Sequence, residues 1–306
     1  MGLCGVILAI NGMKHKFREN LVGYLFISPW LIGFLVFTLY PFCQSFYLSL
    51  TRYNIIQEPK YIGFANYKMM LFQDELFWKS LWVTIRYALV SVPIVLVVGV
   101  LLALLLNINV KGMSIFRTIF YLPSIVPMVA TTSIFMWILN PQVGLVNRVL
   151  ALFGVVGPGW LTDPKWTLWS LVFMAIWGAG GSMVIYLAGL KDIPQYLYEA
   201  ATLDGASVIK KTRMITLPML TPVIFFNLVM GVIGTFQYFT QAFMISKGSG
   251  GPEDSTLFYA LYMFQRSWKY MDMGYGSAMA WALFVIIVIL TTLIFQSQKR
   301  WVHYGR

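Results

Sequence analysis

Ionisable side chains are scarce in this sequence. Only 11% of its 306 residues are Asp, Glu, Lys or Arg, and it contains two histidines and two cysteines. His15 and His303 lie near opposite ends of the chain, and Cys4 and Cys43 have no partner at the spacing of a disulfide or a metal site. We therefore predict no metal site, no disulfide and no redox centre.

The sequence also lacks the residues that hydrolyse nucleotides or move charge across a membrane. It has no glycine-rich loop ending in Gly-Lys-Ser or Gly-Lys-Thr, and no paired carboxylates or nucleophile with a base. A charge inside a bilayer costs about 2.5–3.5 kcal/mol on insertion scales. No Asp, Glu, Lys, Arg or His lies near the centre of an apolar run, and Arg86 and Arg117 lie near run ends, where long side chains reach the headgroups. These absences argue against an enzyme and against proton coupling, but leave sodium coupling through carbonyls and hydroxyls open.

Apolar residues are correspondingly abundant. They make up 59% of the chain, and its mean hydropathy is +0.73, whereas soluble domains average about 45–50% apolar residues. Backbone groups in lipid must be satisfied within the chain, so apolar runs of about 20 residues are predicted to be helices. We predict an all-α integral membrane protein with a tail at 1–20, a transmembrane domain at 21–297 and a second tail at 298–306. The six predicted spans are residues 21–48, 82–107, 114–140, 166–190, 219–246 and 274–295.

The formal charge of +11 comes largely from basic residues that flank the apolar runs. That pattern is typical of a topology signal and does not favour nucleic-acid binding. An even number of spans places both termini on one side, and the short segments on that side have the higher net positive charge. We therefore predict that both termini and residues 191–218 are cytoplasmic.

Residues 191–218 form a polar segment between two apolar runs. Their charged residues include Glu199, Asp204, Lys210, Lys211 and Arg213. Pro194 can start a helix, and Gly205 permits a turn that residues with a Cβ adopt only at a cost. Ser207 is a favourable N-cap for a second short helix, which we expect to end before Pro218. The sequence predicts a helix-turn-helix with small residues at its tip, suited to contact with a soluble partner.

Neutral polar groups are concentrated in the predicted fourth and fifth spans. The fifth contains Thr235, Gln237 and Tyr238, and the fourth contains a glycine cluster, with Gly178 and Gly181, directly after Trp177. Hydroxyls, amides and aromatic rings suit a neutral, hydroxyl-rich solute such as a sugar. For the fifth span we favour a solute path over simple hydrogen bonding between helices. For the glycines, close helix packing and a break that makes room for a solute both remain open.

The polar segment resembles the EAA loop of permeases in binding-protein-dependent ABC importers. The matching residues are Tyr198-Glu199-Ala200-Ala201, Asp204-Gly205-Ala206 and Ile215-Thr216-Leu217-Pro218, at the family's spacing. Residues 116–123, 140–147, 250–256 and 273–278 resemble the sugar-type branch of that family and are similar to the maltose permease F subunit.

The resemblance implies a six-helix ABC importer permease fold in a bacterial cell membrane. Residues 191–218 would be a coupling loop that docks on a cytoplasmic ATPase, with Glu199 making a polar contact and Gly205 making the bend. Its other motif residues are Ala200, Ala201, Asp204 and Ala206. The implied partners are a second homologous permease, two ATPase subunits that bind ATP and Mg²⁺, and an extracytoplasmic solute-binding protein. This chain itself would need no cofactor and no catalytic residue.

The same resemblance places a sugar-contacting glycine at Gly178, and later contacts near Thr235 and Tyr238, where the maltose permease has asparagines. That difference argues against maltose as the solute. We predict ATP-driven import of sugars or oligosaccharides. The alternatives are an ion-coupled carrier of a neutral polar solute, and an importer of glycerol phosphate or acidic oligosaccharides.

Overall fold

The computed structural model describes residues 20, 22–108 and 110–303, and its regular structure is almost entirely helical. Four helices are long and apolar enough to cross a membrane: Val22–Ser49, α4 (Glu75–Leu106), Val208–Ser246 and α15 (Met273–Trp301). Two further candidates are bent pairs, α5 (Met113–Ile125) with α6 (Met128–Ile138), and α8 (Pro164–Trp177) with α9 (Gly180–Lys191). With each pair counted as one span, the described residues contain the six spans that the sequence predicts. The predicted tail at 1–20, except for its last residue, and the end of the tail at 298–306 lie outside the described residues.

The predicted spans 114–140 and 166–190 are each bent in the structure, and the break that the sequence left open for the fourth span is present. A bend of 96° separates α5 from α6, because Val126 is extended and Pro127, which follows it, has no backbone N–H to donate. A bend of 47° separates α8 from α9, where Gly178 ends one helix and Ala179 starts the next.

Two of the four long helices also contain irregular turns. The helix Val22–Ser49 includes the π-helical turn η1 (Leu35–Leu39) and α2 (Tyr40–Ser49). Val208–Ser246 consists of α11 (Val208–Lys211), the π-helical turn η2 (Thr212–Thr216), α12 (Leu217–Phe236) and α13 (Thr240–Ser246). The expected helix end before Pro218 is therefore wrong. Pro218 lies in the first turn of α12, where a missing N–H costs least, and the wide turn η2 precedes it.

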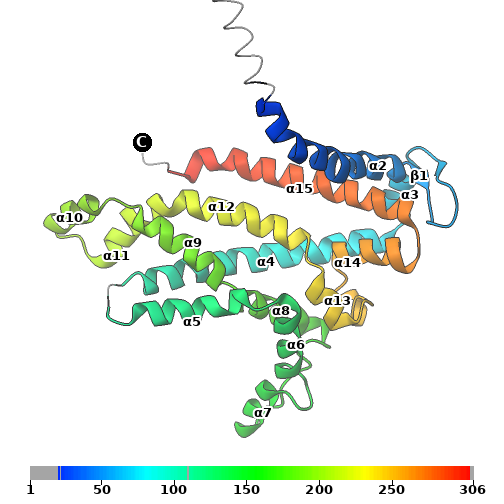
Figure 1. Cartoon of the computed structure of the whole chain (residues 1–306). Helices are drawn as coiled ribbons and strands as arrows, with labels where there is room; N and C mark the ends of the chain where they lie inside the picture. Colours follow the sequence, from blue (N-terminus) through cyan, green and yellow to red (C-terminus); the bar gives the residue numbers. More distant parts are fainter. Residues whose placement is uncertain (1–19, 21, 109, 304–306) are drawn as a thin grey trace, which may run out of the picture.

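The helix α4 is the centre of the fold (Figure 1). It contributes Phe77 to one buried cluster, Tyr87 to a second and Ala103 to a third. It packs on α9 so closely that a Cβ at Gly99 would lie 2.9 Å from a ring carbon of Tyr186. At its last turn, Arg117 of α5 donates two hydrogen bonds to the Leu106 carbonyl, at 3.0 and 2.8 Å. A cation there also interacts favourably with the helix dipole.

The two ends of the molecule differ. At one end, which we call the hairpin end, the strands β1 (Thr51–Arg52) and β2 (Lys60–Tyr61) pair antiparallel. The short helices of this region are α3 (Ala65–Phe72), η3 (Pro252–Asp254), α14 (Tyr259–Phe264) and η4 (Gln265–Lys269). At the opposite end, the loop end, α10 (Gln195–Leu203) and α11 project beyond the other helices (Figure 1). Helix α7 (Leu145–Leu152) extends away from the body of the protein beyond α6.

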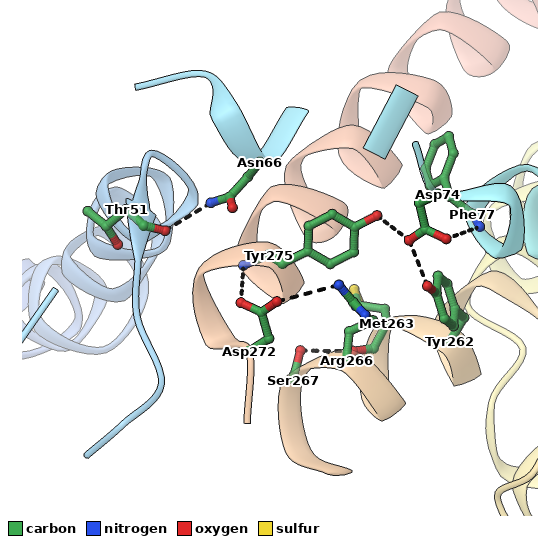
Figure 2. A network of polar contacts seen from close by, with 10 residues as sticks. All are labelled: Thr51, Asn66, Asp74, Phe77, Tyr262, Met263, Arg266, Ser267, Asp272 and Tyr275. Atoms are coloured by element: carbon green, nitrogen blue, oxygen red, sulfur yellow. Dashed lines mark hydrogen bonds and ion pairs between the residues drawn. The ribbon is translucent and has the colours of Figure 1, made fainter. Parts of the chain in front are cut away.

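A polar network around Asp74 joins three elements at the hairpin end (Figure 2). Asp74 caps α4 by accepting the Phe77 N–H at 3.1 Å, and it also accepts the hydroxyls of Tyr262 at 2.6 Å and Tyr275. Burial and this hydrogen bond raise the pKa of the Tyr262 hydroxyl, which therefore stays protonated and donates. The guanidinium of Arg266 lies 4.4 Å from the centre of the Tyr275 ring. The network thus fixes the start of α4 against α14 and α15.

Candidate functional site

The polar segment 191–218 folds as the predicted helix-turn-helix up to residue 211. Pro194 precedes α10, and Gly205, with φ of +71°, directly follows its C-cap residue Asp204. The N–H of Ala206 donates to the Ala201 carbonyl at 2.9 Å, and that of Gly205 donates to the Thr202 carbonyl at 3.0 Å. These two bonds form a Schellman motif, in which the left-handed residue is usually glycine. The motif explains why glycine stands at 205. Ala201 and Ala206, whose backbones it joins, are both half-buried.

Side-chain hydrogen bonds hold the two arms of this segment together. The hydroxyls of Tyr198 and Thr216 lie 2.9 Å apart. The Lys211 ammonium donates to the Thr202 hydroxyl at 2.7 Å. Ser207 accepts the Lys210 N–H at 3.4 Å, which confirms the predicted N-cap. The tip between the arms is therefore fixed by the loop's own contacts.

The tip exposes one acidic group and several apolar ones. Glu199, Ala200 and Asp204 are exposed, and Glu199 has no hydrogen bond or ion pair within the part of the chain that the structure describes. Leu203 is 90% exposed and Ile209 81% exposed, and Val208 beside it is also exposed. We call Leu203, Val208 and Ile209 the apolar tip. Apolar side chains on a polar, fixed segment beyond the predicted membrane region are typical of a docking surface.

Sequence reasoning missed the apolar tip because it emphasised charge and small residues. A signal was present, since Val208 and Ile209 are adjacent apolar residues directly after the Ser207 cap. The candidate span that begins at Val208 has 39 residues, including the break between α12 and α13. A bilayer core of roughly 30 Å needs only about 20 helical residues, so this segment is long enough for part of it to lie beyond the core.

A second candidate region is a cavity of about 400 Å³ between α4, α6, α8, α9, α12 and α13, which we call the inner cavity. The predicted residues Thr235 and Tyr238 both line it. Its other neutral polar lining residues include Ser91, Ser182, Asn227 and Gln241. No charged residue is among the described residues that line it.

Aromatic rings form one wall of the inner cavity. The ring centres of Tyr87 and Tyr238 are 4.8 Å apart, and Phe258 packs within 4.7 Å of Tyr238. The hydroxyl of Thr235 donates to the Gly231 carbonyl at 2.6 Å. The Gln241 amide has no hydrogen bond within the described chain, so it is free to bind a solute. Tyrosine rings and a free amide that line the same cavity are suited to a neutral, hydroxyl-bearing molecule.

The remaining residues predicted for the solute path do not line the inner cavity. Gln237 lines a separate cavity near α14 and α15. Trp177, Gly178 and Gly181 lie at the α8–α9 bend, between the lining residues Ala175 and Ser182. The glycine that packs closely is Gly180. A Cβ at this position would lie 1.9 Å from the Phe120 carbonyl oxygen of α5.

No group of three or more His, Cys, Asp or Glu side chains that could hold a metal ion occurs among the described residues. Neither candidate region presents an arrangement of acid, base and nucleophile among its described residues.

Comparisons with known proteins agree with a transport role. Residues 95–303 match the family described as "Binding-protein-dependent transport system inner membrane component". The chain is 46% identical to a probable ABC transporter permease protein, YesP, of Bacillus subtilis (strain 168), with 94% of this chain and 93% of that protein covered. It is 35% identical to the trehalose/maltose transport system permease protein MalF of Thermococcus litoralis, with 91% and 94% covered.

A solved structure has the same fold. A chain of the bacterial alginate ABC transporter, in complex with an alginate-bound periplasmic protein, superposes with a TM-score of 0.81 at 23% identity, covering 94% of this chain and 96% of that one. In this family the membrane component transports and a separate ATPase hydrolyses ATP, which decides against an enzyme and against an ion-coupled carrier. The chain belongs to the binding-protein-dependent transport system inner membrane component family, the permease subunits of ABC importers.

Proposed function

We propose that this chain forms the translocation path of an ATP-driven importer for sugars or oligosaccharides together with a second, homologous permease. Two cytoplasmic ATPase subunits would drive it, and an extracytoplasmic solute-binding protein would deliver the solute. Relatives of this chain include permeases named for lactose, for trehalose and maltose, and for arabinooligosaccharides. The neutral lining of the inner cavity favours an uncharged saccharide over glycerol phosphate or an acidic oligosaccharide.

The loop end is the cytoplasmic end in this proposal. The segments at that end include Lys111, Lys191, Lys210, Lys211 and Arg213. Dense basic residues next to membrane spans favour the cytoplasmic side. Residues 191–218 therefore face the ATPase, both termini are cytoplasmic, and the hairpin end faces the solute-binding protein.

The exposed apolar tip is the observation that carries the coupling role. Leu203 and Ile209 flank the Gly205 turn, and bonds such as Tyr198 to Thr216 fix the loop without covering them. Burying a Leu or Ile side chain that was exposed is worth about 1.5–3 kcal/mol. A groove on the ATPase that receives the tip would gain this energy, and Glu199 at its edge would make the polar contact. Because α10 and α11 connect α9 to α12, and both of these helices line the inner cavity, motion of the tip would be passed to the walls of that cavity.

The test is a double substitution of the tip, Leu203→Asp with Ile209→Asp, in the permease co-expressed with its complete transporter. We expect the tagged variant to lose the ATPase on purification but to retain the second permease. The matched control is Leu152→Asp, which changes an 83% exposed leucine on α7, remote from the loop end. If the double variant retained the ATPase as well as the control does, the tip would not be the docking surface.

A further inference from the structure

A second cavity lies near the hairpin end, between α2, α14, η4, α15 and residues 237–239, the break between α12 and α13. It has a volume of about 430 Å³, and we call it the outer cavity. Gln237 and Phe239 of the break line it, whereas Thr235, Tyr238 and Gln241 line the inner cavity. The segment 235–241 is thus a wall shared by two cavities. Ser277 and Met273, which also line the outer cavity, lie in the first turns of α15.

Three of the residues that line the outer cavity have polar groups without a partner. The amide of Gln237, the hydroxyl of Ser277 and the indole N–H of Trp268 form no hydrogen bond within residues 20, 22–108 and 110–303. The hydroxyl of Ser267, which also lines the cavity, does have a partner, since it donates to the Met263 carbonyl at 2.8 Å. Polar groups in a concave, mostly apolar site are usually satisfied by water or by a ligand.

Aromatic rings lie beside these free groups. Trp268 is 57% exposed, and Phe239 and Phe264 pack with ring centres 5.0 Å apart on the same cavity wall. An amide, a hydroxyl and an indole N–H next to ring faces can bind the hydroxyls and the apolar face of one sugar ring. Ligand pockets typically have volumes of about 300–1,000 Å³, so the size is suitable. No charged residue is among the described residues that line the cavity.

We propose that the outer cavity is a second saccharide subsite, which a sugar unit occupies before or together with the inner cavity. This inference rests on the proposed import of saccharides. The α12–α13 break would separate the two subsites, since one short segment supplies the amide of each, Gln237 outside and Gln241 inside.

The experiment uses the assembled transporter in lipid nanodiscs with its solute-binding protein and a panel of lactose, maltose, trehalose and arabinooligosaccharides. The panel member that most stimulates ATP hydrolysis is then titrated against Gln237→Ala and Ser277→Ala. Each variant loses one hydrogen-bonding group, so the half-stimulating concentration is expected to rise about 3- to 10-fold. The control Thr292→Ala removes a hydroxyl of the same helix that already donates to the Val288 carbonyl, and should leave the titration unchanged.

Thiol labelling provides a second readout. In a chain with Cys4→Ser and Cys43→Ser, the stimulating saccharide should slow modification of Ser277→Cys. If Gln241→Ala weakened stimulation while Gln237→Ala and Ser277→Ala did not, the inner cavity alone would bind solute and the proposal would be wrong. Cross-linking of Ser277→Cys to the second permease, with no protection by sugar, would make the cavity a subunit interface and also refute it. If no panel saccharide stimulated the parent transporter, the proposed function itself would fail first.

Discussion

Replacing Gly205 separates the effect of backbone strain from the effect of a partner. Gly205 has φ of +71°, and a Cβ at this position would meet no atom within 4 Å. A residue with a Cβ in the left-handed region costs about 1–2 kcal/mol. Within this chain, even a large side chain at 205 should therefore cost little more than this strain.

Gly112 is a matched control for that strain. It also lies at the loop end, between α4 and α5, with φ of +85°, and a Cβ there would likewise meet no atom within 4 Å. Gly112→Trp and Gly205→Trp should therefore lower the stability of the permease by similar amounts. Only at position 205 should the indole occupy space that the ATPase needs.

The assay measures ATPase retained on tagged permease and saccharide-stimulated ATP hydrolysis in the complete transporter. We expect Gly205→Trp to reduce both by at least about tenfold, which corresponds to about 1.4 kcal/mol of lost docking energy. Gly112→Trp should retain most of both activities. Equal losses in the two variants would show that strain alone explains the effect, and the assignment of a coupling turn would be refuted.

Two further pairs of substitutions, each a test with its control, probe the packing of the fold. Asp74→Asn keeps an N-cap but removes the charge that accepts two tyrosine hydroxyls, so the free energy of unfolding of the detergent-solubilised permease should fall by about 1–3 kcal/mol. The side chain of Asp163 only caps α8, so Asp163→Asn should change the free energy of unfolding by less than about 0.5 kcal/mol. Equal effects of the two substitutions would contradict the role of the Asp74 network. Gly180→Ala would place a Cβ 1.9 Å from the Phe120 carbonyl oxygen and should lower the free energy of unfolding by about 1–3 kcal/mol or more. At Gly178 the nearest atom to an added Cβ is 3.5 Å away, so Gly178→Ala should be tolerated in the same unfolding assay.

Local rules predicted the fold of residues 191–211 well. The turn at Gly205 and the cap at Ser207 follow from backbone conformation and from one hydrogen bond, and the structure confirms both. The same rules failed at Pro218, where the preceding π-helical turn lets the helix continue. Whether a proline ends, bends or starts a helix depends on the conformation of the turn before it. The local sequence does not predict that conformation.

The cavities were less accessible to sequence reasoning. Gln237 and Tyr238 are neighbours in one polar run, which suggested a single path. The break between α12 and α13 interrupts the helical phase, so the two residues line different cavities. Similarly, the glycine cluster was interpreted from composition, but only the contact between Gly180 and Phe120 shows which glycine is required for close packing. These distinctions depend on contacts between segments far apart in the chain.

The most direct test of the account is transport by the complete importer in proteoliposomes. We predict that saccharide uptake requires ATP on the side of residues 191–218, requires the solute-binding protein on the opposite side, and is unaffected when sodium and proton gradients are collapsed. Uptake by this chain alone, driven by a sodium or proton gradient and independent of ATP, would contradict it.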